Sequence, residues 1–206
     1  DWRYEAAKYY ANIVLPYSDI VLAFAKKFVS LNLPVKMIAP DHGPIWRKDT
    51  KTIIELYLKW ASQKPERRAV VAFDTMWNST KTMAAALAEG LTAGGVKTSV
   101  MPLKANHRSD IMTELMCAGG FFVGTPTMNK EMYPSVADLL TYAKGLSPKN
   151  LKGQVFGSYG WAPSGQSSAN EMLKAMKVQL CAEPLACKYV PDAAMLEKVR
   201  AYGEEA

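Results

Sequence analysis

Residues 69–80 read Ala-Val-Val-Ala-Phe-Asp-Thr-Met-Trp-Asn-Ser-Thr and pass from an apolar run directly into a polar loop. The apolar part, Ala69–Phe73, shows no alternation of polar and apolar residues, which is typical of a strand covered on both faces. The residues after the loop, Thr80–Ala93, are predicted to form a helix. A buried strand followed by a helix is the building unit of a parallel α/β sheet. This stretch therefore decides the fold class.

The same unit recurs four more times along the chain. Further strands are expected at Thr98–Met101, Gly120–Gly124, Gln154–Ser158 and Cys187–Val190. The helices that follow them are expected at Ser109–Cys117, Tyr133–Lys144, Gln166–Lys177 and Ala193–Tyr202. Five such units predict an α/β fold with a doubly wound, five-stranded parallel sheet and right-handed crossovers.

The first third of the chain has a different pattern. Apolar residues at helical spacing predict a helix over Tyr17–Leu31, and a short strand is expected at Val35–Ala39. Asp49 and Thr50 are plausible caps of a further helix at Thr52–Ser62.

The polar, proline-containing segment Gln63–Arg68 predicts a boundary between two units, residues 1–68 and residues 69–206. The net charge of +6 is unevenly shared, with 12 basic and 7 acidic residues before the boundary and 13 and 12 after it. No run of five basic residues occurs, so we expect no nucleic-acid partner. The apolar stretch Tyr9–Ala25 is interrupted by polar residues, so no membrane span is expected, and three unpaired cysteines favour a cytoplasmic protein.

Ligands of such sheets bind beyond the carboxyl ends of the strands. The loop after the first strand places hydroxyl and amide side chains at a helix N-terminus, where backbone N–H groups attract an anion. A terminal phosphate fits this loop. The alternative is that Ser79 or Thr80 simply caps the helix.

Two further loops at the same edge carry proline, glycine and large aromatic residues. Residues 124–129 read Gly-Thr-Pro-Thr-Met-Asn, and residues 158–165 read Ser-Tyr-Gly-Trp-Ala-Pro-Ser-Gly. Such loops suit a flat ring held between backbone and aromatic faces. The alternative is ordinary turn chemistry, with Trp161 covering the core.

Competing motifs fail on spacing. The first strand is followed by no G-x-G-x-x-G, and no G-x-S-x-G occurs. In residues 90–98 a valine stands where a phosphate-binding loop needs its lysine. Only His42 and His107 are available to a hydrolase triad, and His107 is expected to be a solvated surface residue.

Taken together, these motifs resemble the flavodoxin-like domain of the flavodiiron proteins, also called A-type flavoproteins. The resemblance rests on Thr75–Thr80, Gly124–Thr127 and Tyr159–Trp161. Residues 9–13 (Tyr-Tyr-Ala-Asn-Ile) and 39–47 (Ala-Pro-Asp-His-Gly-Pro-Ile-Trp-Arg) resemble the end of the metallo-β-lactamase-like αββα domain of that family. The resemblance covers essentially the whole chain.

The resemblance implies an oxidoreductase that reduces dioxygen to water or nitric oxide to nitrous oxide at a diiron centre fed by FMN. It assigns the FMN phosphate to Thr75, Met76, Trp77, Asn78, Ser79 and Thr80. It places the isoalloxazine ring between Pro126, Thr127, Met128, Asn129 and Ser158, Tyr159, Gly160, Trp161. It makes His42 a ligand of the iron.

The resemblance is incomplete in two places. The upstream H-x-E-x-D-H motif and the other iron ligands of the family are absent, and one histidine cannot hold two irons. We therefore expect a carboxyl-terminal piece of a longer protein, whose missing amino-terminal half would complete the first domain. Ala162 and Pro163 also stand where glycines are expected in the third loop.

The resemblance further implies a head-to-tail homodimer and an electron donor such as rubredoxin or reduced F420. Two alternatives stay open. A stand-alone flavodoxin-like electron carrier with a helical extension would usually be more acidic than this chain. A response-regulator-like binding module would need clustered carboxylates at the strand ends, where only Asp74 occurs.

Overall fold

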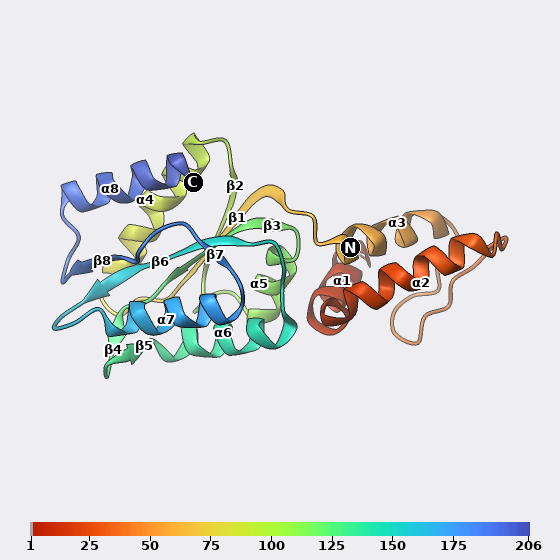
Figure 1. The fold of residues 1–206 in the computed structure, drawn as a ribbon, viewed down its shortest axis with the longest axis horizontal. Helices are drawn as coiled ribbons and strands as arrows, with labels where there is room; N and C mark the ends of the chain where they lie inside the picture. Colours follow the sequence, from red (N-terminus) through yellow and green to blue (C-terminus); the bar gives the residue numbers. More distant parts are fainter. Residues whose placement is uncertain (1) are drawn as a thin grey trace.

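Strand β1 (Glu66–Phe73) occupies an inner position of a parallel sheet in the computed structural model, which describes residues 2–206 (Figure 1). The sheet order is β2-β1-β3-β6-β7, and every pairing in this sheet is parallel. The other strands are β2 (Lys97–Pro102), β3 (Ala118–Gly124), β6 (Lys152–Tyr159), β7 (Gln179–Leu180) and β8 (Leu185–Lys188). The doubly wound sheet expected from the sequence is confirmed, and its order is that of flavodoxin-like folds.

Helices cover both faces of the sheet (Figure 1). One face carries α4 (Ser79–Ala93) and α8 (Ala193–Glu205), and the other carries α5 (Arg108–Leu115), α6 (Pro134–Leu146) and α7 (Ser164–Ala175). Alternate residues of β1 point to opposite layers, so that Val71 packs with the α4 and α8 layer and Val70 with the other. Both faces are buried, which explains why the strand shows no polar alternation.

Two glycines allow α4 and α8 to pack backbone against backbone. A Cβ at Gly90 would lie 2.0 Å from the carbonyl oxygen of Arg200, and one at Gly203 would lie 2.6 Å from that of Leu87. No larger residue fits at either position.

The edge of the sheet next to β6 differs from the prediction, which was a single strand at Cys187–Val190. It is shared by β7 and β8, which both pair with β6. Between them the buried side chain of Gln154 accepts a hydrogen bond from the backbone N–H of Ala182 at 3.1 Å and donates one to the carbonyl of Glu183. The strand ends at Lys188 because Tyr189 adopts a left-handed conformation, with φ +62°.

Residues 2–62 form helices without a sheet. They are α1 (Trp2–Tyr9), a π-helical turn η1 (Tyr10–Val14), a 3₁₀ turn η2 (Leu15–Tyr17), α2 (Ser18–Ser30) and α3 (Thr50–Ser62). Helices α2 and α3 were expected, whereas α1 was not recognised. Asp49 does occupy the N-cap of α3, but its φ is +55° and its side chain makes no capping hydrogen bond.

The strand expected at Val35–Ala39 is wrong. Only an isolated bridge forms there, between Ile38 and Trp46, with backbone N···O distances of 3.0 and 2.8 Å. No neighbouring strand lies alongside in residues 2–62, so this segment stays extended without a ladder.

Apolar and polar contacts join the helical part (residues 2–62) to the sheet part, which begins with β1. Tyr10 and Leu15 are fully buried in the same apolar cluster as the α5, α6 and α7 face. Lys8 pairs with Asp110 at 2.6 Å, and the Tyr142 hydroxyl donates to Asn12 at 2.9 Å. The ammonium of Lys8, donating to the carboxylate of Asp110, holds the pKa of that carboxyl below its usual range.

The polar segment Gln63–Arg68 is not wholly a linker, because β1 already begins at Glu66. Gln63 ties this segment to residues 149 and 150. Its side-chain oxygen accepts a hydrogen bond from the backbone N–H of Lys149 at 2.8 Å, and its backbone carbonyl accepts one from the side chain of Asn150 at 3.0 Å.

Within residues 2–206 no helix combines the length and the apolar character needed to cross a membrane.

Candidate functional site: three loops at the carboxyl edge of the sheet

Strands β1, β3 and β6 end at the same edge. Phe73 lies opposite Gly124, and Gly124 lies opposite Phe156, so their loops start side by side. The backbone N–H of Asp74 still donates to the carbonyl of Gly124 at 3.1 Å, and that of Thr125 to the carbonyl of Phe156 at 3.0 Å. The three loops singled out in the sequence are therefore neighbours.

The loop after β1 leaves the start of α4 without a side-chain cap. Asn78 is the N-cap residue, with φ +70°, and its side chain makes no capping hydrogen bond. The alternative in which Ser79 or Thr80 caps the helix is therefore wrong, since both lie inside its first turn. The N–H groups of that turn remain available to an anion.

Thr80 is the most informative residue of this loop. Its side chain is fully buried, and its Oγ1 has no hydrogen-bond partner among residues 2–206. A buried hydroxyl is normally paired, because leaving it unpaired costs free energy. A phosphate oxygen at the N-terminus of α4 would supply the partner.

The loop after β3 is held by side-chain bonds to its own backbone. The hydroxyl of Thr125, fully buried, accepts from the backbone N–H of Tyr133 and donates to the carbonyl of Pro126, both at 2.9 Å. A small hairpin follows, formed by β4 (Thr127–Met128) and β5 (Glu131–Met132). Its two turn residues, Asn129 and Lys130, have φ of +51° and +67°. The hairpin exposes Met128 and Asn129 at the rim.

The last two residues of β6, Ser158 and Tyr159, and the loop residues Gly160 and Trp161 lie at the same edge. Trp161 is 98% exposed, so the alternative in which it covers the core is wrong. The backbone N–H of Tyr189 donates to the carbonyl of Tyr159 at 2.8 Å, which places a further exposed aromatic residue next to this loop.

Two of the three loops thus carry an exposed tryptophan, because Trp77 in the first loop is 88% exposed. Large aromatic side chains usually bury most of their surface. Exposed rings at a ligand-binding edge are suited to cover a flat apolar ligand. The unpaired Thr80 hydroxyl and these rings together fit a phosphate group joined to a ring system.

The structure adds residues that sequence reasoning missed. The buried amide of Gln166 donates to the carbonyl of Thr125 at 2.6 Å and to that of Ser158 at 3.1 Å. The carboxylate of Asp74, 4% exposed, bonds to the first turn of α6. Nothing in the sequence marks either contact, because each joins segments far apart along the chain.

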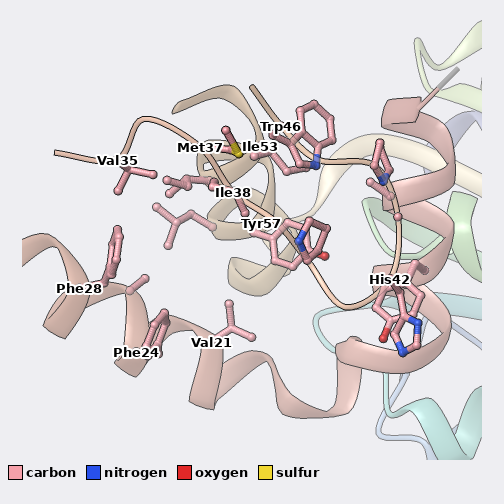
Figure 2. Close-up of a pocket in the computed structure, with 18 of the residues that line it drawn as sticks. Val21, Phe24, Phe28, Val35, Met37, Ile38, His42, Trp46, Ile53 and Tyr57 are labelled. Atoms are coloured by element: carbon pink, nitrogen blue, oxygen red, sulfur yellow. The ribbon is translucent and has the colours of Figure 1, made fainter. Parts of the chain in front are cut away.

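His42 lies elsewhere, in the helical part, at the rim of an apolar cavity of about 1020 Å³ (Figure 2). Figure 2 shows aliphatic and aromatic side chains of α2, α3 and the extended segment between them pointing into this cavity. They include Val21, Phe24, Phe28, Val35, Met37, Ile38, Ile53 and Tyr57. This cavity is distant from the three loops, and its apolar lining suits packing against protein rather than a polar ligand.

The described residues do not contain a metal centre. Within residues 2–206 no group of three or more His, Cys, Asp or Glu side chains gathers closely enough to hold a metal ion. His42 is exposed, and its nearest ring neighbour is Tyr9, with the centroids 5.7 Å apart. The described residues therefore do not make up a diiron site by themselves.

The family model described as flavodoxin matches residues 71–203. The chain belongs to the flavodoxin family. The match begins within β1 and ends within α8, so it covers all three loops and every strand of the sheet except the first residues of β1.

Three similar proteins extend the comparison beyond the flavodoxin part. A nitric oxide reductase of Moorella thermoacetica is 46% identical over 180 residues, which are 87% of this chain and 45% of that protein. The structure of rubredoxin oxygen:oxidoreductase from Desulfovibrio gigas matches 96% of this chain and 50% of its own, with a TM-score of 0.92 and 38% identity. The flavodiiron protein of Giardia intestinalis matches 97% and 49%, with a TM-score of 0.87 and 26% identity.

The chain spans about half the length of the relatives it matches. The resemblance to flavodiiron proteins is confirmed, and it includes the helical part outside the flavodoxin match. The roles of the individual site residues stay predictions.

Proposed function

We propose that this flavodoxin-family chain is the FMN-binding, electron-transferring part of a flavodiiron oxidoreductase that reduces dioxygen to water or nitric oxide to nitrous oxide. The unpaired buried hydroxyl of Thr80 carries the FMN assignment, because it lies in an uncapped helix N-terminus. The names of the similar proteins support the reaction class. A stand-alone carrier is less supported, because the similarity continues through the helical part.

The residues of the first loop bind the phosphate in this proposal. Thr75, Ser79 and Thr80 offer hydroxyl donors, and the first turn of α4 offers backbone N–H groups. No acidic side chain occurs among residues 75–80, which favours a doubly charged phosphate.

The residues of the other two loops orient the ring. Pro126–Asn129 lie on one side and Ser158–Trp161 on the other, and Gln166 fixes the distance between the two backbones. FMN, when bound, would accept electrons from a donor protein or coenzyme and pass them toward iron. The protein's contribution is to orient the ring and to exclude water from it.

The helical part, residues 1–68, would belong to a second domain of the metallo-β-lactamase type. Its apolar cavity and exposed side chains such as Ile20, Phe24 and Val29, each more than 60% exposed, call for a protein surface to cover them. The amino-terminal half of that domain would cover them and would supply the other iron ligands beside His42. Residues 69–206 would form the FMN domain.

A head-to-tail homodimer would bring the FMN of one subunit near the iron of the other. Rubredoxin is a candidate donor, since one similar structure is named a rubredoxin oxygen:oxidoreductase. Reduced F420 is the alternative donor.

Flavin titration tests the FMN assignment. The purified protein, freed of flavin, should bind FMN at least about tenfold more tightly than riboflavin, because only FMN can pair with Thr80. Fluorescence quenching of each flavin measures both affinities. Equal affinities would contradict the phosphate assignment.

Iron content tests the assignment of His42. In the complete protein, His42→Ala should lower bound iron to one atom or none per chain, while FMN content stays unchanged, because the two sites use different parts of the chain. His107→Ala, the other histidine, is the control and should leave iron unchanged. Full iron content in His42→Ala would exclude it as a ligand.

A further inference from the structure

Asp74 is a buried carboxylate directly before the first loop, and the proposed FMN contacts do not use it. Its side chain is only 4% exposed. A buried carboxylate is costly unless it is paired and hydrogen-bonded, so its partners indicate what holds it there.

Each oxygen of the carboxylate bonds to a different segment. Oδ1 accepts from the backbone N–H of Thr75 at 2.7 Å, within the first loop. Oδ2 accepts from the hydroxyl of Ser135 at 2.6 Å, in the first turn of α6. Thr75 thereby keeps its N–H paired although the loop has left the sheet.

A third segment approaches from the loop after β2. The ammonium of Lys104 lies 3.9 Å from Oδ1 of Asp74 and donates to the carbonyl oxygen of Thr75 at 3.4 Å. It supplies a positive charge beside the carboxylate, which would otherwise repel a phosphate in the neighbouring loop. Asp74 and Thr75 therefore join the first loop to the start of α6 and to the loop after β2.

We propose that Asp74 is the positioning residue of the phosphate loop, fixing the backbone of Thr75 against α6 before FMN binds. The inference rests on the proposed function. A loop held in its binding conformation loses less conformational freedom when the ligand arrives, so pre-organisation raises affinity. Since riboflavin has no phosphate, the effect should fall on FMN and spare riboflavin.

Three variants separate the hydrogen bonds from the charge. Ser135→Ala removes only the bond to α6 and should weaken FMN binding about fivefold to tenfold, whereas Asp74→Ala removes both bonds and should weaken it by tenfold or more. Asp74→Asn keeps a side-chain oxygen for Thr75 and an amide that can donate to Ser135, so it should stay within about threefold of the unaltered protein. Riboflavin affinity should change less than about twofold in all three.

The matched control is Asp138→Ala, which removes a carboxylate from α6, the helix that also carries Ser135. Asp138 is half exposed and pairs with Arg108 instead of the phosphate loop. It should leave both flavin affinities unchanged. Titration of each flavin-free protein with FMN and with riboflavin, together with the thermal midpoint of the flavin-free form, gives the required readouts.

Three results would overturn the inference: unchanged FMN affinity in Ser135→Ala, an equal loss for FMN and riboflavin, or an Asp74→Asn variant as weak as Asp74→Ala. The last would assign the effect to charge. Failure of the proposed function looks different, because the unaltered protein would then show no preference for FMN over riboflavin.

Discussion

The side-chain amide of Gln166 donates a hydrogen bond to the carbonyl oxygen of Thr125 at 2.6 Å. Gln166 lies in the first turn of α7, and Thr125 begins the loop after β3. Both residues are fully buried. The bond therefore connects the start of α7 to the loop after β3 through the interior of the protein.

Replacing Gln166 should loosen this connection. Gln166→Leu removes the donor to the carbonyl groups of Thr125 and Ser158 and should lower the free energy of unfolding by about 2–4 kcal/mol. Urea denaturation followed by circular dichroism measures the change. Ser167→Ala, at an exposed neighbouring position, should change it by less than about 0.5 kcal/mol. Similar values for the two variants would show that the Gln166 bonds contribute little.

Thr80→Val should separate stability from binding. The variant removes a buried hydroxyl that has no partner, so the flavin-free protein should become more stable by about 1 kcal/mol. FMN affinity should fall about tenfold or more, because the same hydroxyl would pair with the phosphate.

Thr82→Val is the control, because Thr82 is exposed two residues further along α4 and its hydroxyl donates to the carbonyl of Asn78 at 3.1 Å. It should change FMN affinity less than about threefold. If Thr80→Val bound FMN normally, the phosphate would have to lie elsewhere.

Gly157 and Gly145 should respond oppositely to alanine. Gly157 has φ +152°, and a Cβ there would lie 1.9 Å from the carbonyl oxygen of Thr125. Gly157→Ala should therefore destabilise the protein by about 3 kcal/mol or more and distort the second and third loops.

Gly145 lies within α6 and has open space around a built Cβ. Gly145→Ala should raise the free energy of unfolding by about 0.5–1 kcal/mol, since alanine favours a helix. Thermal unfolding of both variants tests the pair. A stable Gly157→Ala variant would mean that the loop can move away from Thr125.

The Lys8–Asp110 pair should make stability depend on pH in the acid range. The hydrogen bond from Lys8 lowers the pKa of Asp110 in the folded state. The stability that this pair contributes is therefore present above the pKa that Asp110 has in the unfolded chain, and it is lost as the pH falls below about 4. Lys8→Met should reduce the acid-range slope of the thermal midpoint between about pH 5 and pH 3. Lys149→Met breaks another ion pair, with Asp19, whose side chain is more exposed, and should leave the slope nearly unchanged. Identical slopes in the unaltered protein, in Lys8→Met and in Lys149→Met would contradict the assignment of the pH dependence to Asp110.

The sequence by itself determined the repeated strand and helix units, because the apolar residues needed to cover both faces of a parallel sheet leave a pattern within each segment. It also located the three loops, since polar and aromatic residues after a buried strand stand out locally. Residues 35–39 gave a misleading signal: they have the composition of a strand, but a strand forms only where a partner strand pairs with it.

Only the tertiary structure decided which side chains hold the loops together. The bonds of Asp74 to Ser135 and of Gln166 to Thr125 join residues 61 and 41 positions apart, and no local pattern records such contacts. The tertiary structure also decided that Thr80 is buried without a partner and that Trp161 is exposed, because burial depends on what packs against a residue. A local pattern sets the elements, whereas the free energy of a hydrogen bond or of burial depends on groups that meet only after folding.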